Sequence, residues 1–190
     1  MGIGGRRVVA WLIDWACILG WVALTAAVGV PLYLAGITAS AGLVTVNLVG
    51  AFVVVVPVVL GAAWFESRSV AATPGKRALG LVVRTDVGRP PFRIALVRNV
   101  VKIGVPWLIG HAAVFAIVTS SATTGTVPFG VWVLTGVAYV IPLIWIVSLF
   151  VAGGRTPYDR ISGTDVVRRS VLAPRASSAG SEAETPPSRG

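Results

Sequence analysis

Long unbroken runs of apolar residues dominate the sequence. Four runs cover residues 8–34, 44–65, 100–118 and 127–151, with more polar connections between them. Their apolar positions are continuous rather than spaced three or four apart, which is typical of helices surrounded by lipid. A helix needs about 20 apolar residues to cross the hydrocarbon core. The pattern therefore predicts an all-α fold, an integral membrane four-helix bundle.

The third run is the least regular, because Lys102, Pro106 and His111 interrupt it. Proline removes one helix hydrogen bond, but membrane helices tolerate it when neighbouring groups satisfy the backbone. We therefore predict a span over residues 100–118. The segment 91–102 before it is predicted to be amphipathic and to lie at the membrane surface.

The segment between the second and third spans carries signals of local order. Thr73 followed by Pro74 is typical of a helix start, with Thr73 as the N-cap. Residues 79–85 favour a β-strand. A short, partly ordered cytoplasmic middle loop is expected within a transmembrane domain of residues 1–172. Residues 173–190, rich in Ala, Ser, Pro and Glu, are predicted to form a disordered cytoplasmic tail.

Composition and charge agree with a membrane interior and define an orientation. Charged residues make up 12% of the chain, against about 25% in soluble domains. All 16 basic residues fall near the N-terminus, in or just after the middle loop, or in the tail; the connections around 36–42 and 119–126 carry none. Cytoplasmic segments are enriched in Lys and Arg, so both termini are predicted to be cytoplasmic. Arginine outnumbers lysine 14 to 2, a composition typical of GC-rich bacterial genomes.

Asp14 is an acidic residue inside a predicted span. A charge at bilayer depth costs about 2.5–3.5 kcal/mol on insertion scales, so such residues have partners or a function. A rise of about 1.5 Å per residue places it about 9 Å past the helix start, in the inner leaflet. Two interpretations stay open. Asp14 is either a structural anchor, bonded to Arg98, Lys102 or backbone amides of the middle loop, or a carboxylate that binds an ion or relays protons.

Other polar residues are weaker candidates. His111, expected near the midplane, either bonds a neighbouring helix or relays protons with Asp14. Asp159 lies between Arg155 and Arg160 after the fourth span. It is either satisfied by those basic groups in a capped turn or stands at the mouth of a site that Asp14 also lines. Five basic residues are expected to contact lipid headgroups or a partner: Lys76, Arg77, Arg93, Arg98 and Lys102.

Three patches of the sequence resemble one family. Arg7 and Asp14 resemble the opening of the RDD family, residues 73–83 its loop after the second span, and residues 158–167 its closing segment, with Asp159 as the second Asp. The patches follow the family's order. The resemblance implies a small polytopic bacterial membrane protein, for which transport is often proposed, although many members have fewer helices. It also implies that Arg7, Asp14 and Asp159 form one polar cluster near the inner leaflet.

Two classes of function fit these observations. The first is ion or small-solute transport, such as cation/proton antiport, with Asp14 titrating or binding a cation and with Arg7 and Asp159 shaping its access. The alternative is a non-catalytic membrane adaptor or assembly factor that acts through its basic cytoplasmic loop. An enzyme is not expected, because there is no nucleophile–base pair and no metal-ligand spacing; no catalytic residue, metal or cofactor is predicted. The expected partners are a bilayer with anionic headgroups and a second copy of the chain or another membrane protein, and not nucleic acid.

Overall fold

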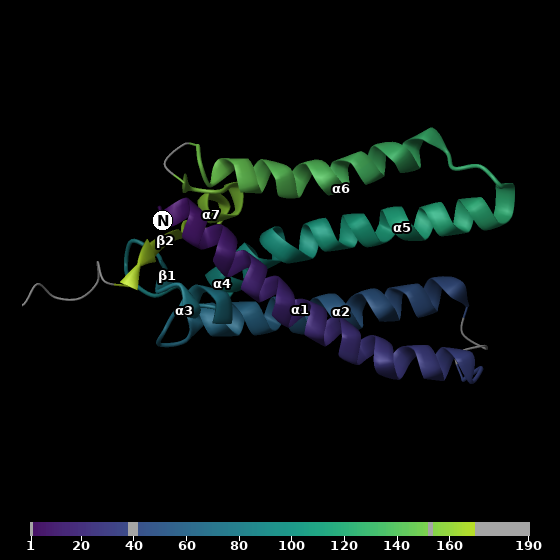
Figure 1. Cartoon of the computed structure of the whole chain (residues 1–190), viewed down its shortest axis with the longest axis horizontal. Helices are drawn as coiled ribbons and strands as arrows, with labels where there is room; N and C mark the ends of the chain where they lie inside the picture. Colours follow the sequence, from purple (N-terminus) through teal and green to yellow (C-terminus); the bar gives the residue numbers. More distant parts are fainter. Residues whose placement is uncertain (1, 38–41, 152–153, 170–190) are drawn as a thin grey trace, which may run out of the picture.

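Four long helical segments run side by side along the molecule (Figure 1). The computed structural model describes residues 2–37, 42–151 and 154–169, so the predicted tail over 173–190 lies outside the described residues. Each segment is long and apolar enough to cross a membrane. They are α1 (Ile3–Leu34), α2 (Leu43–Ser67), the continuous run of α4 (Phe92–Asn99), η1 (Val100–Gly104) and α5 (Val105–Thr124), and α6 (Phe129–Ser148). The predicted all-α membrane four-helix bundle is confirmed.

The third segment differs most from its prediction. The amphipathic lead-in over residues 91–102 is not separate from the span, because α4 continues through η1 into α5 without a break. η1 is a π-helix, in which the amide of Val105 donates to the carbonyl of Val100, five residues earlier. The wider turn comes just before Pro106, which has no amide proton to donate. Backbone bonding is thus rearranged around the proline, and the helix continues.

The middle loop is ordered, and a strand from the end of the described chain completes it. α3 (Pro74–Ala78) begins after Thr73, as predicted, although the Thr73 side chain does not cap it. β1 (Leu81–Arg84) forms within the predicted β-prone run and pairs antiparallel with β2 (Asp165–Arg168). The pairing sets Leu81 opposite Arg168. The sequence patterns did not predict β2, whose partner lies more than 80 residues earlier in the chain.

All the short elements gather at one end of the bundle. α3, β1, α4, β2 and α7 (Pro157–Ile161) lie where α1 begins (Figure 1), and we call this the polar end. A small apolar core here joins Ala10 of α1 to Leu81, Val83 and Val166 of the sheet. The spanning helices instead expose most of their apolar side chains, and α6 has no buried residue. Such outward apolar surface suits lipid, so side-chain burial is concentrated at the polar end.

Candidate functional site

Arg98 lies at the centre of a buried ion network at the polar end. Its guanidinium is fully buried and bridges two carboxylates. Nη1 donates to Oε1 of Glu66 at 2.6 Å, and Nη2 donates to Oδ1 of Asp159 at 2.7 Å. Nε donates to the hydroxyl oxygen of Thr164 at 3.1 Å. Because these partners come from the end of α2, from α7 and from the turn before β2, one side chain ties three separate parts of the chain together.

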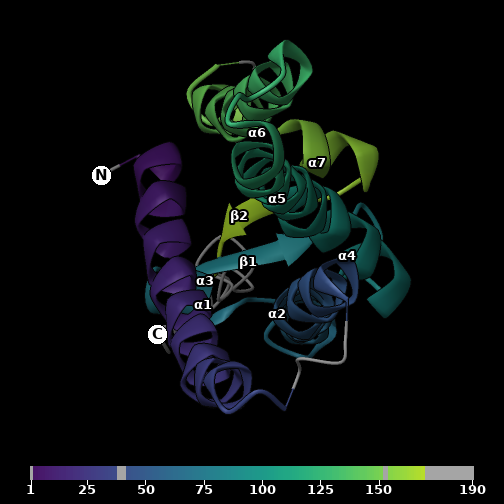
Figure 2. The same cartoon turned by 90° about the vertical axis from the view of Figure 1, so that its right-hand side faces the viewer.

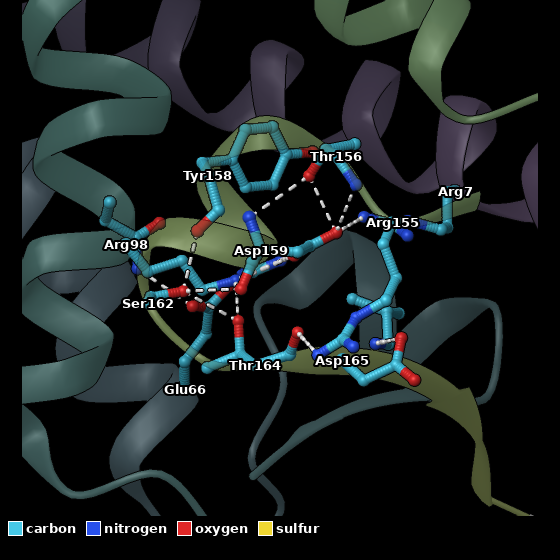
Figure 3. Close-up of polar contacts among 12 residues, drawn as sticks. Arg7, Glu66, Arg98, Arg155, Thr156, Tyr158, Asp159, Ser162, Thr164 and Asp165 are labelled. Atoms are coloured by element: carbon cyan, nitrogen blue, oxygen red, sulfur yellow. Dashed lines mark hydrogen bonds and ion pairs between the residues drawn. The ribbon is translucent and has the colours of Figure 1, made fainter. Parts of the chain in front are cut away.

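Asp159 is surrounded by donors (Figure 3). Its Oδ1 accepts from Arg98, and its Oδ2 accepts from Nη2 of Arg7 at 2.5 Å. The same Oδ2 accepts from the hydroxyl of Thr156 at 2.6 Å and from the backbone amide of Thr156 at 3.1 Å. Thr156 and Asp159 form a capping box at the start of α7. Burial alone would raise the pKa of Asp159, but the positive charges of Arg98 and Arg7 hold it well below its usual range. Asp159 is therefore a stable anion.

Glu66 is the second acceptor of the network. Its Oε1 accepts from the Lys76 ammonium as well as from Arg98, and its Oε2 accepts from the amide nitrogen of Asn99 at 2.8 Å. Burial lowers the pKa of Lys76 to about 8, against the opposing attraction of Glu66. The sequence patterns did not indicate Glu66, because the second apolar run ends at residue 65. A carboxylate in the last turn of a spanning helix was the signal that could have found it.

Burial corrects the expectation for two of the basic residues. Lys76 is 5% exposed and Arg98 is 0% exposed, so neither can contact lipid headgroups or a partner. Both point inward because Glu66 and Asp159 offer buried negative charge there. Arg77 and Arg93 are exposed, as headgroup contacts require, and their role stays a prediction.

Asp14 is held by α3 and not by the network. Its Oδ2 accepts from the hydroxyl of Thr73 at 2.7 Å, and its Oδ1 accepts from the backbone amide of Gly75 at 2.8 Å. α3 lies so close to α1 that a Cβ on Gly75 would be 2.0 Å from the carbonyl oxygen of Ala10. Among the partners predicted for Asp14, the structure shows a backbone amide of the middle loop, that of Gly75. Arg98 and Lys102, the other predicted partners, do not donate to it.

The expected Arg-Asp-Asp cluster is accordingly divided. Arg7 and Asp159 form a direct ion pair, whereas Asp14 bonds to Thr73 and Gly75. Arg7 and Asp14 still line one small cavity of about 60 Å³, together with Lys76, Arg98 and Lys102. The division arises because Arg7 and Asp14 lie two turns apart on α1 and meet different elements. Arg155, expected beside Asp159, donates instead to the carbonyl of Thr164.

A larger cavity of about 400 Å³ adjoins this small one. Its wall comes from all four spanning segments, which surround a common centre when the bundle is viewed end-on (Figure 2). Asp14 and Lys102 line both cavities, and most other lining residues are apolar. The rings of Trp15 and Trp107, both in its wall, stack with their centroids 5.9 Å apart, and this contact joins α1 to α5. The polar end thus holds a buried ion network next to this larger, mainly apolar cavity, which we call the chamber.

His111 lies away from these groups. Its Nε2 is 3.3 Å from the carbonyl oxygen of Asn47, which joins α5 to α2. His111 is not among the residues that line either cavity. The structure therefore gives it the helix-to-helix contact that was one of its two predicted roles, and it does not place His111 beside Asp14.

Fold and site together define a multi-pass membrane protein with a buried ion network that joins both ends of the described chain. The model of the RDD family matches residues 4–163. The chain therefore belongs to the RDD family, and the matched region contains Arg7, Asp14 and Asp159. The comparisons with curated proteins and with solved structures give no match.

Proposed function

We propose that this RDD-family protein transports a cation in exchange for protons and that Asp14 binds both. The position of Asp14 carries the proposal, because its carboxylate lines the cavity of about 400 Å³ among the four spanning segments. The two buried carboxylates of this region are instead each paired with two basic side chains: Glu66 with Lys76 and Arg98, and Asp159 with Arg7 and Arg98. Asp14 is the carboxylate that retains access to a chamber.

The hydrogen bonds of Asp14 suit an exchange site. A carboxylate has about four acceptor positions, and the contacts from Thr73 and Gly75 use two of them. The remaining capacity is available to a cation or a proton, and the two fixed donors orient the group. Intramembrane carboxylates of this kind mark ion pathways and proton relays in transporters.

The Arg7–Asp159 pair has a positioning role in this proposal. Arg7 and Asp14 lie on the same helix, and Arg7 is bound to α7 through Asp159. The pair holds the first turns of α1 in place, so the Asp14 side of the chamber keeps its shape. Neither residue needs to bind the transported ion.

The same proposal includes the orientation and the membrane. Arg77 and Arg93 at the polar end are exposed, and cytoplasmic segments carry such positive charge. We place the polar end in the cytoplasm and the protein in the bacterial cell membrane. The activity proposed is transport without chemical conversion of a substrate.

Cation-driven proton flux in proteoliposomes tests the proposal. Purified protein is reconstituted with a pH-sensitive dye inside, and Na⁺ or K⁺ gradients are then applied. We expect Asp14→Asn to reduce flux to the level of empty liposomes. His111→Gln is the matched control, because it also alters a polar residue within a span but lies outside both cavities, and it should retain flux. Wild-type flux in Asp14→Asn would remove Asp14 from the mechanism, and background flux in the wild type would remove transport.

A second candidate is the adaptor function, favoured by the exposed side chains of Arg77 and Arg93. A photo-crosslinker at position 77 would capture a protein partner if this surface docks one. A crosslinker at Phe129, the exposed first residue of α6, is the control, because α6 begins at the end of the bundle away from α3 (Figure 1). Capture of lipid alone at position 77 would count against a protein partner.

A further inference from the structure

Lys102 is a basic residue that Glu66 and Asp14 attract but that forms no hydrogen bond or ion pair within the described part of the chain. Its ammonium makes no hydrogen bond and no ion pair with any described residue, whereas Arg7, Lys76 and Arg98 each pair with a carboxylate. Lys102 lies in η1 and lines both cavities. Local π-helical turns occur frequently at functional sites, because they redirect side chains. The cavity wall therefore contains a lysine side chain whose hydrogen-bonding capacity the described residues do not use.

Lys102 and Asp14 are the basic and the acidic residue in the wall of the larger cavity. Asp14 is held by hydrogen bonds from Thr73 and Gly75, whereas Lys102 has none from the described residues. Arg7, Lys76 and Arg98 line the small cavity beside it, and each is paired with Glu66 or Asp159. A basic group without a close partner is costly to bury, so an anionic group beside Lys102 would be stabilising. The ligand expected here therefore carries an anionic group.

The remaining lining fits a hydrocarbon chain. On α1 it extends from Trp11 to Trp21, about 15 Å of helix axis at about 1.5 Å per residue. The indole of Trp21 donates at 3.2 Å to the carbonyl oxygen of Val53. In a regular helix this oxygen would accept from the amide of residue 57, but Pro57 has no amide proton. Trp11 and Trp145 line both cavities together with Asp14 and Lys102, and Trp15 and Trp107 line the larger one. Tryptophan rings collect at headgroup level in membrane proteins. The polar groups thus lie at headgroup depth and the apolar wall extends inward.

We propose that this chamber holds the phosphate and one acyl chain of a phospholipid with an anionic headgroup, with the phosphate at Lys102 and the chain along α1 towards Trp21. A lysine ammonium binds phosphate as a point charge. Basic pockets between membrane helices on the cytoplasmic side bind lipid headgroups. The chamber of about 400 Å³ falls in the range of ligand cavities, which combine mainly apolar walls with a few polar groups.

This inference goes beyond the proposed transport and does not depend on it. The lipid phosphate meets Lys102, whereas the exchanged cation meets Asp14. Replacing Asp14 should therefore stop flux and leave lipid binding intact, or strengthen it because a neighbouring negative charge is lost. Replacing Lys102 should release the lipid. The two proposals can fail separately.

Native mass spectrometry of the full chain tests the lipid site. The protein is extracted from bilayers that contain phosphatidylglycerol and phosphatidylcholine in equal amounts, and the retained lipid is identified. We expect wild type to keep one phosphatidylglycerol and to prefer it over phosphatidylcholine. Lys102→Gln should lose that preference. Arg93→Gln, which removes an exposed charge from the same helical segment, and Asp14→Asn should both keep it.

Three outcomes would overturn the proposal. The first is equal retention of the two lipids by wild type, which would indicate apolar contact alone. The second is unchanged phosphatidylglycerol in a folded Lys102→Gln. The third is displacement of the lipid by inorganic phosphate, which would indicate a site for free anions. If Lys102→Gln does not fold, Lys102→Arg must retain the lipid, because it keeps the charge, and its loss in that variant would also contradict the proposal.

Discussion

The guanidinium of Arg7, near the start of α1, donates at 2.5 Å to the carboxylate of Asp159 in α7, across 152 positions of sequence. The side chains of both residues are almost fully removed from solvent. Arg7 also donates at 2.5 Å to the carbonyl of Gly154, which follows α6. The pair therefore links α1 to α7, and through Asp159 it is connected to Arg98.

Loss of one member of this pair should strongly destabilise the fold. Asp159→Asn removes the carboxylate that pairs with Arg7 and one of the two carboxylates that pair with Arg98. Breaking a buried ion pair in this way costs about 3–5 kcal/mol. We expect a loss of this size in the free energy of unfolding, measured by denaturant titration in detergent micelles. Arg160→Gln is the matched control, since Arg160 is adjacent but exposed, and it should change stability by less than about 0.5 kcal/mol. Wild-type stability in Asp159→Asn would contradict the structural role.

Acid stability should depend on Asp159 in a specific direction. Its pKa is held below the ordinary value of about 3.9 by Arg98 and Arg7, despite the opposing effect of burial. Its contribution is therefore fully present above about pH 4 and is lost as the pH falls through the lower, folded-state pKa. The stability difference between wild type and Asp159→Asn should be constant above pH 4 and shrink below it. A difference that is independent of acid pH would be inconsistent with the ion pair.

Lys76 should make stability increase with pH in an alkaline range. Its pKa is about 8 in the folded protein and about 10.4 in an unfolded chain. Between these values the unfolded state binds more protons, so the free energy of unfolding should rise with pH. Lys76→Met keeps the side-chain length and should lose this rise, as measured by unfolding at pH 7 to 10.5. Arg77→Gln, exposed on the same short helix, should keep it.

Gly75→Ala should separate α3 from α1. The added methyl would lie 2.0 Å from the carbonyl oxygen of Ala10 and 3.0 Å from Oδ1 of Asp14. Overpacking costs about 1–3 kcal/mol or more. Moving α3 away from α1 would also break the hydrogen bond from the amide of residue 75 to Asp14. We expect lower unfolding stability and lower flux. Gly136→Ala is the control, because a Cβ there meets nothing within 4 Å and alanine favours a helix. Full stability and flux in Gly75→Ala would mean that the close approach is not required.

The sequence by itself determined the four spans and the gathering of positive charge at one end. Both follow from local properties, since a run of about 20 apolar residues needs no distant partner to form a helix in lipid. The start of α3 after Thr73 was predictable for the same reason, because Pro74 limits its own backbone. The resemblance of the sequence to the RDD family pointed to Arg7, Asp14 and Asp159, although it did not show how they are paired.

Only the tertiary structure decided which charges meet. Arg98 pairs with Glu66 across 32 positions and with Asp159 across 61, and no spacing in the sequence encodes those distances. The same is true of β2, which forms only because β1 lies beside it. Asp14 was expected in one cluster with Arg7 and Asp159, yet Gly75 and Thr73 bind it instead. A buried charge is stabilised by the nearest groups in space, so its partners are known only after the chain has folded.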